Sequence, residues 1–136
     1  MTIYFRYKSI KRPDGTKVKT PSIPISLSGK EKFDTIALLD SGADISAIPL
    51  GIAEILGLDL SGKRTPAYGI GGKVDSVETK MSIKVEKHHE HYSFQIPVKV
   101  ILGAYDFPFL LGRLGFFDKF IISFDQRQEK VSLKKQ

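Results

Sequence analysis

An aspartate stands where an apolar run ends. The run Ile36 to Leu39 leads directly into Asp40-Ser41-Gly42, and a second acid, Asp44, follows two residues later. Burying a carboxylate costs free energy unless the group is paired, hydrogen-bonded or put to use. The chemistry open to such a group is proton transfer. The alternative is a strand end closed by a turn in which the aspartate bonds its own backbone, and that arrangement is common.

The surroundings of Asp40 strengthen the chemical interpretation. The apolar run would deliver the carboxylate, Gly42 allows a tight turn, and the Ser41 hydroxyl stands beside it. A matching apolar-apolar-glycine segment occurs later, at Leu110 to Gly112. The Asp-Ser/Thr-Gly pattern occurs only once in the chain.

Other reactive groups offer weaker candidates. Ser41 could be a nucleophile, but no histidine partner is evident, because His88, His89 and His91 lie together elsewhere. Histidine tracts can bind metal. Here, however, charged flanking residues fit an exposed hairpin turn, and neighbours on a strand point to opposite faces. We expect no metal and no cofactor. The chain has no cysteine, so it offers neither a thiol nucleophile nor a disulfide.

The elements that would position Asp40 are mostly strands. β-branched, aromatic or alternating apolar residues predict strands at Thr2 to Tyr7, around Ile23 to Leu27, at Ile36 to Leu39, on both sides of the glycines 69 to 72, at Tyr92 to Leu102 and near Leu110. Pro21 and Pro24 indicate that the second of these is an edge strand or is interrupted. The run before Asp40 is expected to be buried on both faces.

Two short helices and a closing hairpin complete the prediction. One helix is expected over Pro49 to Leu56, with Pro49 at its first position and Gly57 at its end. The other follows Gly112. The tail is predicted to form a hairpin, and four of its side chains are expected to face inward: Ile122, Phe124, Val131 and Leu133.

Composition limits the class of protein. The 136 residues suit a single domain, 1–136. The net charge of +6 invites a nucleic-acid interpretation, but the basic residues are scattered and no nucleic-acid motif accompanies them. No apolar run approaches the roughly 20 residues that span a bilayer. The first residues also lack the features of a signal peptide. We therefore expect neither nucleic acid nor membrane as a partner, and a cytoplasmic location.

Three segments together resemble the retropepsin-type (retroviral-like) aspartic proteases. "ALLDSGAD" matches the active-site pattern of that family, "LLGR" its apolar-apolar-Gly-Arg segment, and "AYGIGG" stands where the family carries its flap. The resemblance runs from about Pro21 to Phe120. It implies a mainly β, single-lobe, closed β-barrel with short helices, active as a homodimer. The implied segments are an N-terminal hairpin extension 1–20, a flap hairpin 65–80 and a C-terminal hairpin 120–136.

The resemblance implies an aspartic endopeptidase. Two carboxylates sharing one proton would activate a water, and a chain with a single such motif would supply Asp40 from each subunit of a homodimer. The Ser41 hydroxyl would bond backbone across the dimer, and Gly42 would allow close approach. In retroviral enzymes both chain termini build the dimer sheet. Both ends differ here: residues 1–20 resemble a hairpin that compact retroviral enzymes lack, and the tail resembles the closing hairpin of pepsin-like lobes, ubiquitin-shuttle proteins and bacterial single-domain relatives. These differences leave the form of the interface open.

Substrate binding is assigned in the same way. The resemblance implies that Asp44 reaches the backbone of an extended peptide and pairs with Arg113. Ile45 replaces an acid found in some retroviral enzymes, which should alter substrate preference. The remaining residues expected to bind substrate are Ala43, Tyr68, Ile70, Gly71, Gly72 and Leu114. The segment "GIGG" lacks the Gly-Lys-Ser/Thr of a phosphate loop, and its alternative is an ordinary long hairpin.

Two other functions remain open at this level. One is a catalytically weak or inactive module of the same fold that binds peptides or mediates dimerisation, since a fold does not prove its function. The other is a precursor that becomes active after self-cleavage, for which "KSIKRPDGTK" and "SLKKQ" are exposed-looking candidate segments.

Overall fold

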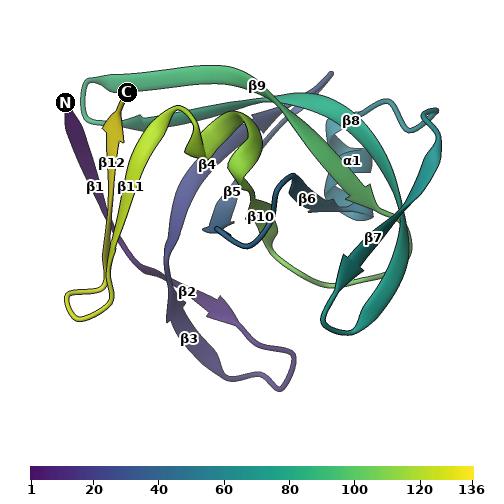
Figure 1. The fold of residues 1–136 in the computed structure, drawn as a ribbon, viewed down its shortest axis with the longest axis horizontal. Coiled ribbons are helices and arrows are strands. Elements are labelled where there is room, and N and C mark those ends of the chain that lie inside the picture. Colours follow the sequence, from purple (N-terminus) through teal and green to yellow (C-terminus); the bar gives the residue numbers. More distant parts are fainter.

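The computed structural model describes residues 1–136, and most of them lie in strands (Figure 1). The elements in chain order are β1 (Thr2–Arg6), β2 (Lys8–Lys11), β3 (Lys17–Thr20), β4 (Ser22–Ser28), β5 (Lys32–Leu39), β6 (Ser46–Pro49), α1 (Leu50–Leu56), β7 (Arg64–Gly69), β8 (Gly72–Lys87), β9 (Glu90–Ile101), β10 (Phe109–Leu111), η1 (Arg113–Phe117), β11 (Phe120–Asp125) and β12 (Lys130–Lys135). The predicted mainly β class is confirmed. None of the helices has the length and apolar character that a membrane crossing demands.

Six strands close into a ring. They run in the order β4-β5-β10-β6-β9-β8, and β8 pairs back onto β4. β7 extends the sheet beyond β8. Two of the pairings are parallel, β5 with β10 and β6 with β9. The ring agrees with the expected closed barrel. The parallel pairing of β5 and β10 places the ends of these two strands side by side.

Alternate residues of the ring strands fill its interior. Ile23, Ile25 and Leu27 of β4 are at most 4% exposed, as the period of two predicts. Aromatic rings close one side of this core, where Phe116 packs against Phe120 with centroids 5.1 Å apart. Burial of such apolar surface is the main force that holds the ring together.

The prediction from Pro21 and Pro24, that this strand (β4) is an edge strand or is interrupted, is confirmed. β8 pairs only with Ser26–Ser28, whereas β5 pairs with the whole strand. The stretch around Pro24 is therefore hydrogen-bonded on one side alone. A proline, which has no N–H to donate, is tolerated there.

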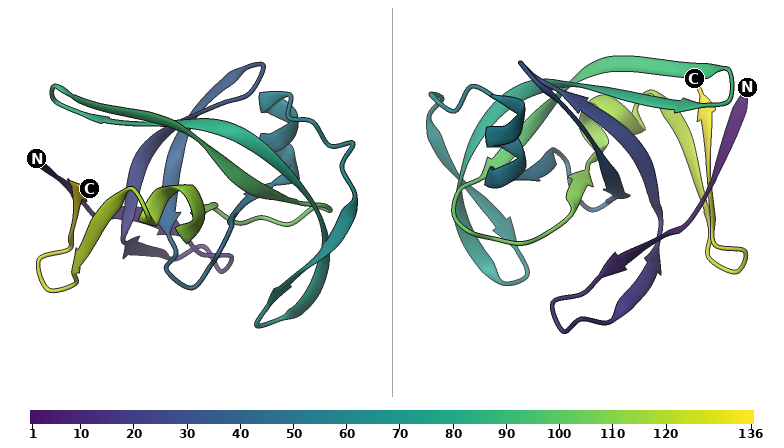
Figure 2. Two further views of the ribbon diagram at one scale, coloured as in Figure 1. Left: turned by 45° about the horizontal axis from the view of Figure 1, so that its top comes forward. Right: turned by 180° about the vertical axis from the view of Figure 1, so that it is seen from behind.

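The chain termini form a separate sheet. β1 pairs with β12 and β12 with β11, so the two ends of the chain lie side by side (Figure 1). The N-terminal hairpin is accordingly shorter than the expected 1–20, because β1 belongs to the terminal sheet. It consists of β2 and β3, and it projects away from the ring in Figure 1 and in the right view of Figure 2. Sequence patterns do not reveal that the first strand pairs with the last one.

Two predicted helix details are corrected. Pro49 is the N-cap of α1 and the last residue of β6, because its extended backbone still belongs to the ladder with β9. Gly57 ends the helix as predicted, with φ 67°. The segment after Gly112 is an irregular turn in place of a regular helix, since Leu114 and Gly115 have non-helical backbone angles.

Two burial predictions are also corrected. β5 is fully buried only at alternate positions, Ala37 and Leu39, because the other face of its last residues is partly open. Phe124 is 43% exposed. It lies on β11, the edge strand of the terminal sheet, whereas Val131, which stands opposite it on β12, and Leu133 are fully buried and Ile122 packs against the core.

Candidate active site

The parallel pairing of β5 and β10 fixes Asp40. Leu39 of β5 lies opposite Leu111 of β10. One residue further, the Asp40 amide donates a 3.0 Å hydrogen bond to the Leu111 carbonyl. The half-buried aspartate is therefore held by the neighbouring strand as well as by its own.

The loop after Asp40 folds back on the carboxylate. The Gly42 amide donates to Asp40 Oδ1 at 3.0 Å, and the Ala43 amide donates to the Asp40 carbonyl at 3.2 Å. This is the local turn that the alternative interpretation of the motif predicted. The turn and the site are compatible, because one carboxylate oxygen can orient the group while the other is left for a partner.

Arg113 holds this loop from the β10 side. Its guanidinium Nη1 donates to the Ser41 carbonyl at 2.8 Å, and its backbone amide donates to the Ala43 carbonyl at 2.9 Å. The expected Asp44–Arg113 ion pair is wrong for this structure. Asp44 Oδ1 instead accepts the Ile45 amide at 2.8 Å. The guanidinium is thus engaged by a loop carbonyl, and the acid is turned toward its own backbone.

Gly112 permits the close approach of the two segments. A β-carbon at this position would lie 2.8 Å from the Ile45 carbonyl carbon and 2.9 Å from both the Ala43 oxygen and the Ser46 nitrogen. The Gly112 amide also donates to the buried Ser46 hydroxyl at 2.9 Å. The sequence analysis missed Ser46. Its only sequence signal is an inward position in β6, between Ile45 and Ala47.

A cleft of about 880 Å³ opens beside Asp40. Its rim combines the active-site loop with the β7–β8 hairpin. Nine residues assigned from the sequence line it: Asp40, Gly42, Ala43, Asp44, Ile45, Tyr68, Ile70, Gly71 and Gly72. Ser41, Arg113 and Leu114 do not. The main lining residues missed are Ala47, Lys99, Ile101, Tyr105, Asp106, Phe107 and Leu110, most of which occupy strand faces that only the sheet pairing brings together.

The β7–β8 hairpin carries apolar side chains that the single chain does not cover. Ile70 at its tip is fully exposed and Tyr68 is 77% exposed. Gly72 has φ 118°, a backbone conformation open to glycine and strained for other residues. Exposed large apolar groups at a hairpin tip beside a cleft indicate a surface that a ligand or partner covers.

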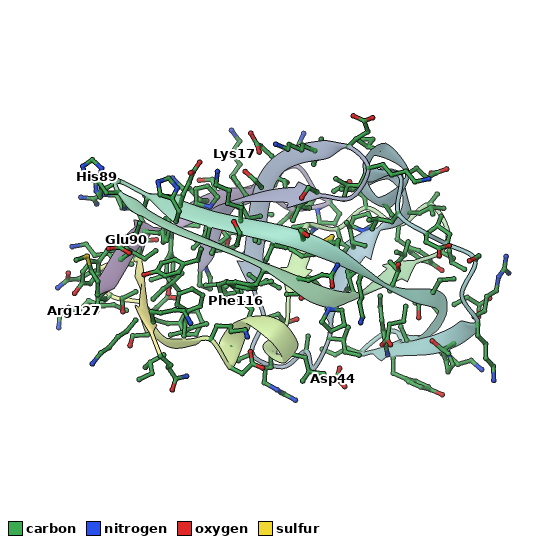
Figure 3. The ribbon with its side chains drawn as sticks, turned by 90° about the horizontal axis from the view of Figure 1, so that it is seen from above. Lys17, Asp44, His89, Glu90, Phe116 and Arg127 are labelled. Atoms are coloured by element: carbon green, nitrogen blue, oxygen red, sulfur yellow. The ribbon has the colours of Figure 1, made fainter.

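The histidines lie far from this cleft. His88 and His89 form the β8–β9 turn, and His89 and Glu90 stand at the opposite end of the long β8–β9 ribbon from Asp44 (Figure 3). His91 Nδ1 lies 2.8 Å from Glu86 Oε2. The pKa of Glu86 is lowered, mainly by its hydrogen bond with Lys84. The exposed turn expected from the charged flanks is confirmed.

Comparison with known proteins finds two similar solved structures. A retropepsin-like aspartic protease from Rickettsia conorii has a similar structure, with a TM-score of 0.57 and 21% identity over 98% of this chain and 90% of that one. The EIAV protease complexed with the inhibitor HBY-793 also resembles the chain, with a TM-score of 0.47 and 26% identity over 70% of this chain and 83% of that one. No family model matches the sequence, and no curated protein matches it significantly.

The Rickettsia match shows that the chain has the retropepsin-like fold. It covers the terminal segments as well, which the sequence motifs alone did not reach.

Proposed function

We propose that this protein is an aspartic endopeptidase that acts as a homodimer. The observation that carries the proposal is the position of Asp40. It is half-buried, held on a glycine turn by the neighbouring strand, and it lines a cleft bordered by a glycine-rich hairpin. The retropepsin-like fold supports the same class of reaction.

Two copies of the chain would complete the catalytic group. Two neighbouring carboxylates cannot both ionise, so an Asp40 pair would share one proton. The ionised member would take a proton from a water held between them as that water attacks the peptide carbonyl. The protonated member would donate a hydrogen bond to the carbonyl oxygen and stabilise its developing charge. The Gly42 amide would keep each carboxylate in orientation throughout.

The β7–β8 hairpin would close over an extended peptide. Backbone groups around Gly71 and Gly72 would bind it as an added strand. Ile70 and Tyr68, which are uncovered in the single chain, would then pack on the substrate or on the partner subunit. Closure of such a flap excludes water from the reacting groups.

The test is cleavage of a mixed library of unstructured peptides between about pH 3 and pH 8, with Asp40→Asn as the matched variant. Asn preserves the shape and the acceptor for the Gly42 amide but cannot share a proton. We expect wild type to cleave between apolar residues with a bell-shaped pH profile, and Asp40→Asn to be inactive with an unchanged unfolding midpoint.

The oligomeric state of the same samples decides what a negative result means. Sedimentation or light scattering would be measured at the assay concentration. A wild-type dimer that cleaves nothing would overturn the peptidase proposal in favour of a module that binds peptides or mediates dimerisation. Cleavage that survives Asp40→Asn would overturn the assigned role of Asp40.

A further inference from the structure

One lysine lies in the wall of the cleft. Lys99 on β9 stands opposite Ala47 on β6, and Ala47 in turn stands opposite Leu110 on β10. All three residues line the cleft. Val98 and Val100, on either side of Lys99, are fully buried in the core. The alternation of the strand therefore directs Lys99 to the face that borders the cleft.

The ammonium group of Lys99 has no partner in the structure. It forms no ion pair within 4.0 Å and no hydrogen bond, although the residue is half-buried. Its sheet neighbours that line the cleft are apolar, namely Ala47, Ile101 and Leu110, whereas Glu78 stands directly opposite it on β8 and does not line the cleft. A charge in such a position costs free energy as water is removed, unless an opposite charge arrives.

Four carboxylates could compete for Lys99, and none is paired with it. Asp40 lines the same cleft, and its Oδ1 accepts the Gly42 amide. Glu78 stands directly opposite on β8 but is exposed and does not line the cleft. Asp44 lines the cleft and bonds the Ile45 amide. Asp106 lines the cleft from the exposed loop between β9 and β10.

We propose that Lys99 makes this part of the cleft a subsite for an acidic side chain of the bound peptide. The inference rests on the proposed function, because it assumes that an extended peptide occupies the cleft. A glutamate would neutralise the ammonium group as the peptide displaces water, and its methylene groups would pack against Ala47 and Leu110. An apolar side chain there would leave a desolvated charge without a partner.

The first experiment uses sets of peptides that differ at one position at a time, with Glu, Gln, Leu or Lys. Cleavage by wild type gives kcat/KM, and fluorescein-labelled versions give the binding affinity for Asp40→Asn. We expect one position at which Glu is favoured over Leu and Gln by about tenfold or more. Lys99→Met, which keeps the apolar stem, should abolish that preference, and Lys99→Glu should shift it to Lys.

Matched controls distinguish a specific effect of Lys99 from an effect of the protein's overall charge. Lys80→Met removes an exposed lysine of β8 that does not line the cleft, so the preference should persist. Glu78→Gln removes the cross-strand acid and should also leave the preference in place. The discrimination between Glu and Gln should disappear as the pH falls below about 4.3, where glutamate is protonated. A structural effect of the substitution would not follow that titration.

The outcomes distinguish this inference from the function on which it rests. Cleavage or binding without an acid preference, or a preference that Lys99→Met leaves intact, would overturn the subsite alone. Absence of both cleavage and binding for every peptide would overturn the subsite together with the proposed function.

Discussion

The guanidinium of Arg113 donates a 2.8 Å hydrogen bond to the backbone carbonyl of Ser41. The bond joins two segments 72 residues apart in sequence, the turn that carries Asp40 and the turn that follows β10. Together with the bond from the Arg113 amide to the Ala43 carbonyl, it fixes the loop on which the proposed catalytic carboxylate stands. Arg113 is thus a positioning residue outside the cleft, where the sequence resemblance implied a partner for Asp44.

Replacing Arg113 should therefore loosen the loop. We expect Arg113→Leu to lower kcat/KM for peptide cleavage by about tenfold or more and to lower the free energy of unfolding by about 1 kcal/mol, the worth of one such hydrogen bond. Arg127→Leu, in the exposed β11–β12 turn, is the matched control and should change neither. An Arg113→Leu enzyme with wild-type activity would contradict the positioning role. Steady-state kinetics and urea unfolding provide both measurements.

Gly112 should be intolerant of even one added methyl group. Its β-carbon would meet backbone atoms of Ala43, Ile45 and Ser46 at 2.8–2.9 Å, so Gly112→Ala must displace the active-site loop. Overpacking of this kind typically costs about 1–3 kcal/mol, and peptide cleavage should be lost. Gly51→Ala in α1, where nothing lies within 4 Å of the new methyl, should instead stabilise the protein by about 0.5–1 kcal/mol. Equal unfolding midpoints for the two variants would refute the packing argument.

Ile70 should matter for substrate binding and hardly at all for folding. Its side chain is fully exposed at the tip of the β7–β8 hairpin, so Ile70→Ser should change the free energy of unfolding by less than about 0.5 kcal/mol. The kcat/KM for peptides should fall, because the tip would lose its apolar contact in the closed state. Ile55→Ser, at an exposed position of α1, is the control for lost surface hydrophobicity. Unchanged kinetics for Ile70→Ser would exclude a role of this side chain in closure.

Asp59 should contribute to stability only while it is ionised. Hydrogen bonds from the Ser61 hydroxyl and the Ser61 amide lower the pKa of its carboxyl group. A lowered pKa in the folded state means that the stabilisation is complete above the ordinary aspartate value of about 3.9 and is lost as the pH falls through the folded-state value. Asp59→Asn should thus have a lower urea midpoint than wild type near pH 6, and the difference should shrink as the pH falls below about 3.9.

The Ser61 hydroxyl is the main cause of that shift, which gives the control. Ser61→Ala should raise the pKa of Asp59 toward its ordinary value, as followed by NMR of the carboxyl carbon. A pKa that does not move in Ser61→Ala would show that another interaction sets it.

The strands, helix end and turns around the site were predictable from sequence wherever they depend on neighbouring residues alone. The period of two in β4, the glycine that ends α1 and the glycine-rich turn after β7 each arise from backbone conformation and neighbouring side chains. Asp40, at the end of an apolar strand and before a glycine, carries its signal in three adjacent residues. These signals sufficed to predict the mainly β class and the loop with its acid.

Strand pairings and hydrogen bonds between segments far apart in sequence were decided by the tertiary structure alone. The pairing of β1 with β12, the Arg113–Ser41 bond in place of an Asp44–Arg113 pair, and the buried Ser46 hydroxyl under Gly112 all join segments far apart in sequence. Such contacts depend on which strands become neighbours and at what register, and a one-residue change of register would turn every side chain to the opposite face. Lys99 shows the consequence, because only its alignment with Ala47 and Leu110 turns an ordinary strand lysine into part of the cleft.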